Sequence, residues 1–267
     1  MAGGDGGTWE YSGWALVTGA SSGMGDAIAR ALAARGMSVL LAARRAERLR
    51  ELAVELRREY RVDAEAIPAD LGKPAAAGVL WIEATDGREI HLLVNNAGFG
   101  LKGRFDALSL DRQAEMVRLN CTALMELTHL ALPGMRERRA GGIVNVSSVA
   151  AFQPVPDLAV YAASKAFVLS LTQAVAEESR GSGVRVLALC PGPVATGFQE
   201  VAGTQVTGRT PGIMTAEEVA EATLRALEAG DDTVVPGALN RLGTIAGRMF
   251  PRSLVVRAAK TVMRKMR

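Results

Sequence analysis

Short apolar runs alternate along the chain with longer segments in which apolar residues recur every three or four positions. The first run, over residues 14–17, precedes an Ala-rich periodic segment over 25–35, and a second run follows over 37–42. Apolar runs of about 4–8 residues are typical of strands buried on both faces, and the periodic segments are typical of amphipathic helices. The chain therefore begins with a strand, a helix and a second strand.

The same alternation continues as far as residue 235. Strands that alternate with helices predict an α/β fold, in which a doubly wound, seven-stranded parallel sheet of the Rossmann type carries helices on both faces. Later strands are expected over residues 62–67, 91–94, 142–146, 184–189 and 233–235. Later helices are expected over 45–60, 74–85, 108–139 (one or two helices), 158–180 and 215–229, the last with Thr215 as its N-cap and a nearby Glu.

No repeat or linker divides these elements, so they belong to one domain. The 267 residues, 49% hydrophobic and 22% charged, are enough for a single large core. We expect a Gly-rich, flexible tail over residues 1–13, the Rossmann-type domain over 14–237, and a basic amphipathic helical extension of that domain over 238–267.

The turn after the first strand is rich in glycine: TGASSGMG, residues 18–25. Glycines at such a turn let the backbone approach a ligand, and the N-terminus of the next helix attracts phosphate. The spacing Gly-x3-Gly-x-Gly differs from the usual Gly-x-Gly-x-x-Gly fingerprint, and turns with three glycines also occur without ligands. The position between the first strand and the first helix favours a nucleotide site.

The second strand ends in two arginines, Arg44 and Arg45, and no acid stands there. A dinucleotide-binding unit that prefers NAD usually has an acid at this place, while an arginine accommodates a 2′-phosphate. The alternative is that both are solvated residues of the next helix. Cations at a helix N-terminus oppose the macrodipole, so we favour Arg44 as a phosphate ligand.

The stretch YAASK places Tyr161 and Lys165 on one face of a helix. Alone, such a pair is most often an exposed tyrosine beside a solvated amine. Together with TGASSGMG and the NNAG loop over residues 95–98, however, it makes the sequence resemble the short-chain dehydrogenase/reductase family over roughly residues 13–237.

The resemblance implies a set of site residues. The catalytic residues are Tyr161, Lys165, Ser148, which stands thirteen residues before the tyrosine, and Asn120; Ser147 is an adjacent decoy. Considered without the rest of this set, Asn96 could equally be a turn former, and Asn120 could be an amide in the interior of a helix. The implied contacts with the cofactor, NADP(H), are Gly19, Ser21, Ser22, Gly23, Met24, Gly25, Arg44, Asp70, Leu71, Asn96, Ala97, Gly98, Tyr161, Lys165, Pro191, Gly192, Val194 and Thr196.

The chemistry explains why a tyrosine stands beside a lysine. A free phenol has a pKa of about 10. The positive charge of Lys165 is expected to lower the pKa of Tyr161 toward the operating pH. In the reductive direction NADPH gives a hydride to a carbonyl carbon, Tyr161 protonates the oxygen, and Ser148 stabilises its developing charge. In the family the lysine also binds ribose hydroxyls, and the asparagine, here Asn120, holds a water.

The expected substrate side is mostly apolar, so a hydrophobic ketone, aldehyde or secondary alcohol is the expected substrate. Residues 197–214 match the family's mobile lid, in which Arg209 could reach a carboxylate. The alternatives are a 3-oxoacyl thioester reductase and, in another class, a non-catalytic dinucleotide-binding sensor, against which the intact Ser148, Tyr161 and Lys165 argue. The apolar residues are Phe99, Phe152, Pro154, Val155, Leu158, Pro193 and Phe198.

Charge and cysteine content limit the partners. Residues 240–267 hold eight basic residues and no acid, which leaves 23 basic against 28 acidic residues, a net charge of −5, for residues 1–239. The main part of the chain therefore gives no reason to expect nucleic acid. Cys121 and Cys190 are too few for a disulfide framework, and no CxxC motif indicates a metal site. With no signal peptide and no run as long as a membrane span, we expect a cytoplasmic protein.

Two surfaces predict further contacts. The helical segments 108–139 and 158–180 carry more apolar positions than one sheet face requires, and the family pairs such helices, so a homodimer or homotetramer is expected. The tail either packs over the substrate side or a partner subunit, or lies on an anionic membrane surface, where each basic residue contributes about 1 kcal/mol. Its apolar stripe is Val255, Ala258, Ala259, Val262 and Met266, and the basic residues on the opposite side are Arg257, Lys260, Arg264 and Arg267.

Overall fold

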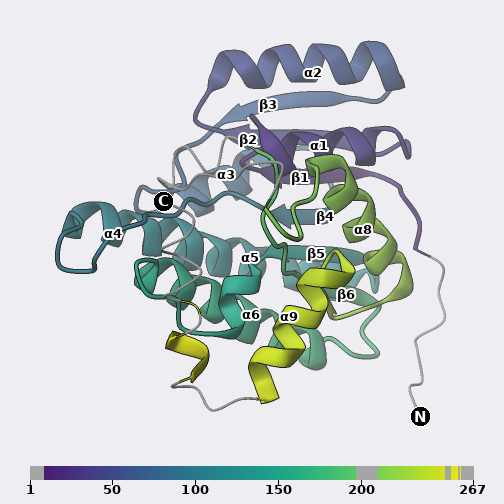
Figure 1. Cartoon of the computed structure of the whole chain (residues 1–267). Coiled ribbons are helices and arrows are strands. Elements are labelled where there is room, and N and C mark those ends of the chain that lie inside the picture. The colour runs from purple at the N-terminus through teal and green to yellow at the C-terminus, as the bar shows by residue number, and fades with distance from the viewer. Residues whose placement is uncertain (1–8, 197–209, 250–253, 258, 260–267) are drawn as a thin grey trace.

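The computed structural model describes residues 9–196, 210–249, 254–257 and 259, and it contains the expected parallel sheet with helices on both faces (Figure 1). The strands lie in the order β3-β2-β1-β4-β5-β6-β7, and every neighbouring pair is parallel. Their bounds are β1 (Trp14–Thr18), β2 (Ser38–Ala43), β3 (Ala64–Pro68), β4 (Ile90–Asn95), β5 (Gly141–Val146), β6 (Val184–Leu189) and β7 (Thr233–Val234).

The helices cover the two faces of the sheet in separate groups. Helices α1, α2 and α8 pack on one face, and α3, α5 and α6 pack on the other (Figure 1). The helices are α1 (Gly23–Ala33), α2 (Ala46–Tyr60), α3 (Ala76–Thr85), α4 (Leu110–Val117), α5 (Leu124–Glu137), α6 (Ala159–Glu178), α8 (Ala216–Ala229) and α9 (Ala238–Met249), with a π-helical turn η1 (Arg118–Ala123) and a 3-10 turn η2 (Val149–Phe152).

The strand order fixes where a ligand can bind. The chain winds outward from β1 to β3 and then returns past β1 to β4, so the direction of winding reverses between β1 and β4. Ligands of open parallel sheets bind outside the carboxyl ends of the strands at such a reversal. The loops that follow β1, β4, β5 and β6 therefore bring residues far apart in the sequence to one edge.

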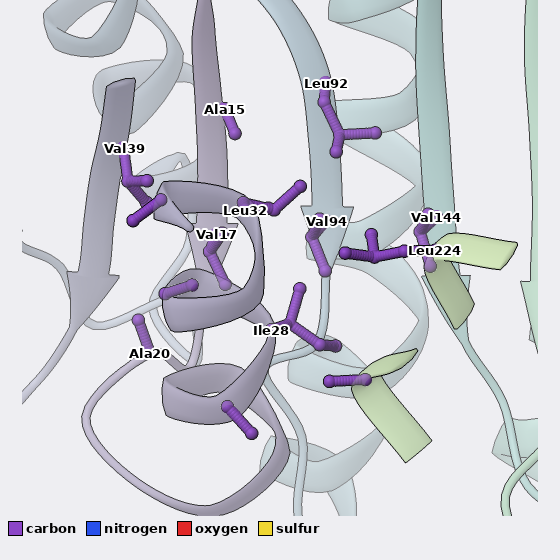
Figure 2. Packing of buried hydrophobic residues seen from close by; sticks show 14 of the residues in the cluster. Ala15, Val17, Ala20, Ile28, Leu32, Val39, Leu92, Val94, Val144 and Leu224 are labelled. Atoms are coloured by element: carbon purple, nitrogen blue, oxygen red, sulfur yellow. The ribbon is translucent and has the colours of Figure 1, made fainter. Parts of the chain in front are cut away.

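The core on the α1 and α8 face is a layer of fully buried aliphatic side chains. Figure 2 shows Val17 of β1, Ile28 of α1, Val94 of β4 and Leu224 of α8 in this layer, and each has no exposed surface. Burial of a side chain of this size contributes about 1.5–3 kcal/mol before the entropy cost of ordering it. This layer fixes the first helix against the strands whose ends carry the site.

The predicted elements are confirmed, with most bounds shifted by one or two residues. The segment expected to hold one or two helices contains α4 and α5, joined by the π-helical turn η1. Thr215 caps α8 as expected, because its side chain accepts from the backbone N–H of Glu218 and the Glu218 carboxylate accepts from the N–H of Thr215. This reciprocal pair is a capping box.

The flexible tail expected over residues 1–13 includes residues that pack on the folded domain. Trp9 and Tyr11 pack against the core, and the Tyr11 hydroxyl donates to Glu228 at 2.6 Å. The guanidinium of Arg35 lies 5.4 Å from the centroid of the Tyr11 ring, a cation–π arrangement. Aromatic burial orders these residues, while residues 1–8 lie outside the described part of the chain.

Helix α6 corrects the expectation that no run reaches the length of a membrane span. It has 20 residues, and an 18-residue stretch within it has a mean hydropathy of 1.3, so the helix is long and apolar enough to cross a membrane by length and composition alone. Its buried positions include Lys165 and Thr172, and it packs against β6 and η2. A helix of small apolar residues packed on a sheet satisfies the same criterion, and α6 is such a core helix.

The C-terminal extension begins with α9, which packs against η2. Its outward face exposes Leu239, Leu242 and Ile245, which are 57%, 64% and 50% exposed. Residues 254–257 and 259 are also helical, and most of the predicted amphipathic stripe over 253–267 lies outside the described residues.

Candidate active site

Ser148 and Tyr161 meet just beyond the carboxyl end of β5. Ser148 is the N-cap of η2, and its Oγ accepts from the backbone N–H of Ala150 at 3.1 Å. Tyr161 lies in the first turn of α6, and its side chain is hydrogen-bonded to that of Ser148. The predicted pairing of these two residues is therefore present in the fold.

Lys165 lies one turn further along α6 and is almost fully buried, with 4% of its surface exposed. Its Nζ donates to the carbonyl oxygen of Val146 at 2.8 Å and lies 6.0 Å from the centroid of the Tyr161 ring. Burial lowers the pKa of Lys165 to about 8, against the opposing charges of Cys121 and Cys190. A lysine in this state exchanges a proton near neutral pH far more readily than a solvated one.

The expectation that Lys165 lowers the pKa of Tyr161 is wrong for the arrangement in this structure. Burial raises the pKa of the Tyr161 phenol above its ordinary value, and the hydrogen bond with Ser148 opposes that rise. The Lys165 ammonium donates to the carbonyl of Val146. Ser148 is the neighbour whose hydrogen bond favours the phenolate here.

The two adjacent serines have different partners, which distinguishes their roles. Ser147 is 1% exposed, and its Oγ donates to the backbone carbonyl of Lys165 at 2.7 Å. Ser148 is 8% exposed and faces Tyr161. Ser147 therefore joins α6 to the end of β5, while Ser148 is the serine that contacts the Tyr161 side chain.

Asn120 joins the site from the π-helical turn η1. It is fully buried; its Nδ2 donates to the carbonyl of Phe99 at 3.0 Å and to Ser164 Oγ at 3.1 Å, and its Oδ1 accepts from the N–H of Phe99 at 3.1 Å. A Cβ on Gly98 would stand 2.9 Å from Asn120 Oδ1 and 3.5 Å from Lys165 Nζ. Gly98 thus lets the loop after β4 approach both residues, and the extra residue of a π-turn is a common feature of functional sites.

The glycine loop is tied to the end of β4 by Asn96. The Asn96 Nδ2 donates to the carbonyls of Thr18 at 2.9 Å and Gly19 at 3.3 Å, and Thr18 Oγ1 accepts from the N–H groups of Asn96 and Ala97. Gly19 has φ of +68°, and a Cβ there would stand 2.8 Å from Asn96 Nδ2. Both the turn and this close approach require glycine.

The start of α1 fits a dinucleotide phosphate. Its N-cap, Ser22, makes no hydrogen bond from its side chain to the helix backbone, so the first-turn N–H groups have no side-chain cap. A Cβ on Gly23 would stand 3.1 Å from the side chain of Thr196, which brings the loop after β6 beside the glycine loop. These are the residues that would hold the pyrophosphate of a dinucleotide.

Two arginines follow β2, and they have different partners. Arg44 has a side chain that is 65% exposed and lies 3.9 Å from Glu115. Arg45 was missed as a site residue, yet it donates to Ser22 Oγ at 2.7 Å and to both the carbonyl and the Oγ of Ser21. The double arginine at the end of β2 was the available signal, and only the fold shows which of the two reaches the glycine loop.

Asp70 and Leu71 lie on the same side, after β3. Asp70 Oδ1 accepts from the N–H of Gly72 at 3.2 Å, which forms a local turn, and Leu71 is 7% exposed. A Cβ on Gly72 would contact Glu115, the partner of Arg44. The residues expected at the adenosine end therefore lie close to one another.

The loop after β6 is bonded both to the start of η2 and to the segment that precedes α8. The carbonyl of Pro191 accepts from the N–H of Val149, and a β-bridge joins Val194 to Met214. Residues 191–196 therefore stand between η2, whose N-cap is Ser148, and the segment that precedes α8.

The apolar residues expected to line the substrate side fall into small clusters near η2. Val155 packs with Ala162 and Leu158, while Phe152 packs with Leu169 and Cys190. Phe99 is 7% exposed, and the Arg112 guanidinium lies 4.9 Å from its ring centroid. Phe198, Arg209 and most of the expected lid lie outside the described residues.

Comparison with known proteins decides the family. The family model described as short chain dehydrogenase matches residues 13–207, which is most of the chain. The chain belongs to the short-chain dehydrogenase family. Ser148, Tyr161 and Lys165 all fall inside the matched segment, whereas α8 and α9 lie beyond it.

Relatives within the short-chain dehydrogenase family differ in what their names say they do. A very-long-chain 3-oxoacyl-CoA reductase of Anas platyrhynchos is 37% identical over 74% of this chain and 65% of its own length. An inactive hydroxysteroid dehydrogenase-like protein 1 of Homo sapiens is 35% identical over 70% of this chain and 57% of its own length. The chain thus spans about three fifths of the length of these curated relatives.

A solved structure agrees over nearly the whole chain. The short-chain dehydrogenase from Sphingobium yanoikuyae, in complex with NADPH, is 34% identical, with a TM-score of 0.80, over 89% of this chain and 93% of that one.

Proposed function

We propose that this short-chain dehydrogenase is an NADPH-dependent oxidoreductase that transfers a hydride between nicotinamide and a carbonyl or secondary alcohol of a hydrophobic substrate. The observation that carries the proposal is the convergence of Ser148, Tyr161, Lys165 and Asn120 at the sheet edge where the glycine loop begins. A protein that only bound the nucleotide would not need Ser148 hydrogen-bonded to the Tyr161 phenol at that edge.

Arginines at the expected 2′-phosphate site support NADPH over NADH. Arg44 is solvent-exposed beside Glu115, and Arg45 is already bonded to the serines of the glycine loop. An ionised guanidinium forms short, strong hydrogen bonds to phosphate oxygens, and no acid stands at the end of β2 to bind a ribose hydroxyl instead. The structural neighbour in complex with NADPH supports the same cofactor.

When bound, the nicotinamide supplies the hydride, and the side chains of this chain handle the proton and the charge. Tyr161 donates a proton to the substrate oxygen in reduction and removes it in oxidation. Ser148 hydrogen-bonds the same oxygen and favours the tyrosine phenolate. Lys165 binds ribose hydroxyls and returns a proton to Tyr161, a role that its lowered pKa of about 8 supports.

A hydrophobic substrate is supported by the apolar clusters around η2 and by the names of relatives. The reductase of Anas platyrhynchos acts, by its name, on very-long-chain 3-oxoacyl-CoA, which keeps the reduction of a 3-oxoacyl thioester as the second candidate. The human relative is named inactive, which keeps the non-catalytic dinucleotide sensor as the candidate of another class. The intact Tyr161 and Lys165 favour an enzyme.

Exposed apolar side chains on the helices around the site support a homodimer or homotetramer. Met125 and Leu130 of α5 are 41% and 36% exposed, and Phe167 of α6 is 41% exposed. Burial of such residues against a second copy would remove apolar surface from water. A cytoplasmic location, and contact of the basic tail with an anionic membrane, stay predictions from the sequence.

Substrate profiling with purified protein tests the proposal. NADPH consumption is measured with bulky ketones, aldehydes and 3-oxoacyl thioesters, and NADH is the matched control cofactor. We expect turnover with NADPH on bulky ketones. Turnover on thioesters alone selects the second candidate, tight NADPH binding without any turnover selects the sensor, and no NADPH binding refutes the proposal.

A further inference from the structure

Asn240, in the first turn of α9, lies against the loop after β6. Its Nδ2 donates to the carbonyl of Gly212 at 2.9 Å and to that of Pro236 at 3.0 Å, so both amide protons are used. Gly212 lies two residues before Met214, which forms the β-bridge to Val194. A side chain outside the segment matched by the family model is thus bonded next to the loop that follows β6.

Three glycines make room for the Asn240 amide. A Cβ on Gly192 would stand 2.4 Å from its Cγ, Oδ1 and Nδ2; one on Gly212 would stand 2.4 Å from Oδ1, and one on Gly237 would stand 3.1 Å from Nδ2. Gly212 and Gly237 have φ of +74° and +85°, which favours glycine by itself, but Gly192 has no such φ. The absence of a side chain at Gly192 is therefore explained by the Asn240 amide that packs on its Cα.

The same loop is also held by backbone hydrogen bonds. The N–H of Met214 donates to Pro193 at 3.1 Å, and the N–H of Ala195 donates to Met214 at 2.9 Å. The loop ends at Thr196, which lies beside Gly23 of the glycine loop. The loop is thus enclosed between these hydrogen bonds and the amide plane of Asn240.

We propose that Asn240 is a positioning residue that fixes the loop over residues 191–196, which the family resemblance implies to lie beside the nicotinamide, for the nicotinamide half of the cofactor. The inference rests on the proposed function, because it assigns Asn240 to the nicotinamide end of that site. It gives the C-terminal extension a role in the reaction, since α9 carries the residue that determines where Gly192 lies.

Two ligands distinguish a positioning role of Asn240 from a general effect on the stability of the protein. NADPH occupies both ends of the site, whereas adenosine 2′,5′-bisphosphate occupies only the adenosine end. We expect calorimetry on the full chain to show that Asn240→Ala weakens NADPH binding about tenfold, the order expected for one or two lost hydrogen bonds, and leaves binding of the bisphosphate unchanged. Gly243→Ala is the control, because a Cβ at that position of α9 would contact nothing within 4 Å.

An equal loss of affinity for both ligands, or no loss for either, would overturn the inference. If Asn240→Ala does not fold, Asn240→Leu repeats the test, since leucine fills a similar volume without the two donors. If neither variant folds, Asn240 serves folding and the inference fails. A wild-type protein that binds neither ligand refutes the proposed function instead, so the two failures are distinguishable.

A double variant tests the contact with Gly192 directly. Gly192→Ala places a Cβ against the Asn240 amide, so we expect its affinity for NADPH to fall. Asn240→Gly removes the opposing amide, so the double variant should bind NADPH more tightly than Gly192→Ala alone. No recovery in the double variant would mean that Gly192 is required for another reason.

Discussion

Lys165→Met should change how the stability of the protein depends on pH. The pKa of Lys165 falls from 10.5 to about 8 because the amine is buried. Between these values the unfolded chain binds a proton that the folded chain does not, so the wild-type free energy of unfolding rises with pH in this range. The shift corresponds to about 3 kcal/mol, at about 1.4 kcal/mol for each pH unit.

Urea unfolding of the wild type and of Lys165→Met, followed by circular dichroism from pH 7 to pH 10.5, measures this difference. Methionine keeps the length of the side chain without the charge, and the loss of the hydrogen bond to Val146 adds only an offset that does not depend on pH. We expect the stability of the wild type relative to the variant to increase by about 3 kcal/mol across this range. Lys73→Met, at an exposed position, is the matched control for removal of one lysine.

A difference between wild type and Lys165→Met that stays constant over this range would refute the reasoning. It would mean that the amine is solvated in the folded protein, and that Lys165 does not stand beside Tyr161 as a buried, readily deprotonated group.

Four other variants test separate parts of the structure. Ser148→Ala should lower kcat about a hundredfold or more, whereas Ser147→Ala, which loses a bond to the Lys165 backbone, should act mainly on the melting temperature; the reverse ranking in steady-state kinetics would show that the wrong serine was chosen. Arg45→Ala should lower the preference for NADPH over NADH about tenfold or more, measured as a ratio of kcat/KM values, and an unchanged ratio would contradict the assignment. Thr215→Ala should lower the free energy of unfolding by about 1 kcal/mol through loss of the capping box, and urea denaturation with no shift in midpoint would contradict that role.

The features that the sequence predicted well depend on local pattern or on fixed spacing. Continuous apolar strands and periodic helices locate most elements within one or two residues, and Thr215 with Glu218 defines a helix start by itself. Ser148 was chosen over Ser147 because the family resemblance implies a serine thirteen residues before the tyrosine, and in the structure the two serines have separate partners.

What the sequence did not predict depends on burial and on contacts between distant segments. The pKa of Tyr161 rises because the fold buries it, and no spacing along α6 contains that information. Arg45 reaches Ser21 only because β2 lies beside β1. Trp9 packs on Gly142 of β5, more than a hundred residues away in the sequence. The contact between Asn240 and Gly192 likewise forms only when α9 packs against the loop after β6.

The measurement that tests the central claim most directly compares the wild type with Tyr161→Phe in a single turnover. Each protein is first saturated with NADPH, with binding followed by nicotinamide fluorescence, and is then mixed with a ketone that the wild type reduces. We predict nearly equal affinity for NADPH and a loss of about 10²–10⁴-fold in the rate of hydride transfer, because only the proton donor is removed. A variant that reduces the ketone at the wild-type rate would contradict the assignment of Tyr161 as the general acid and base.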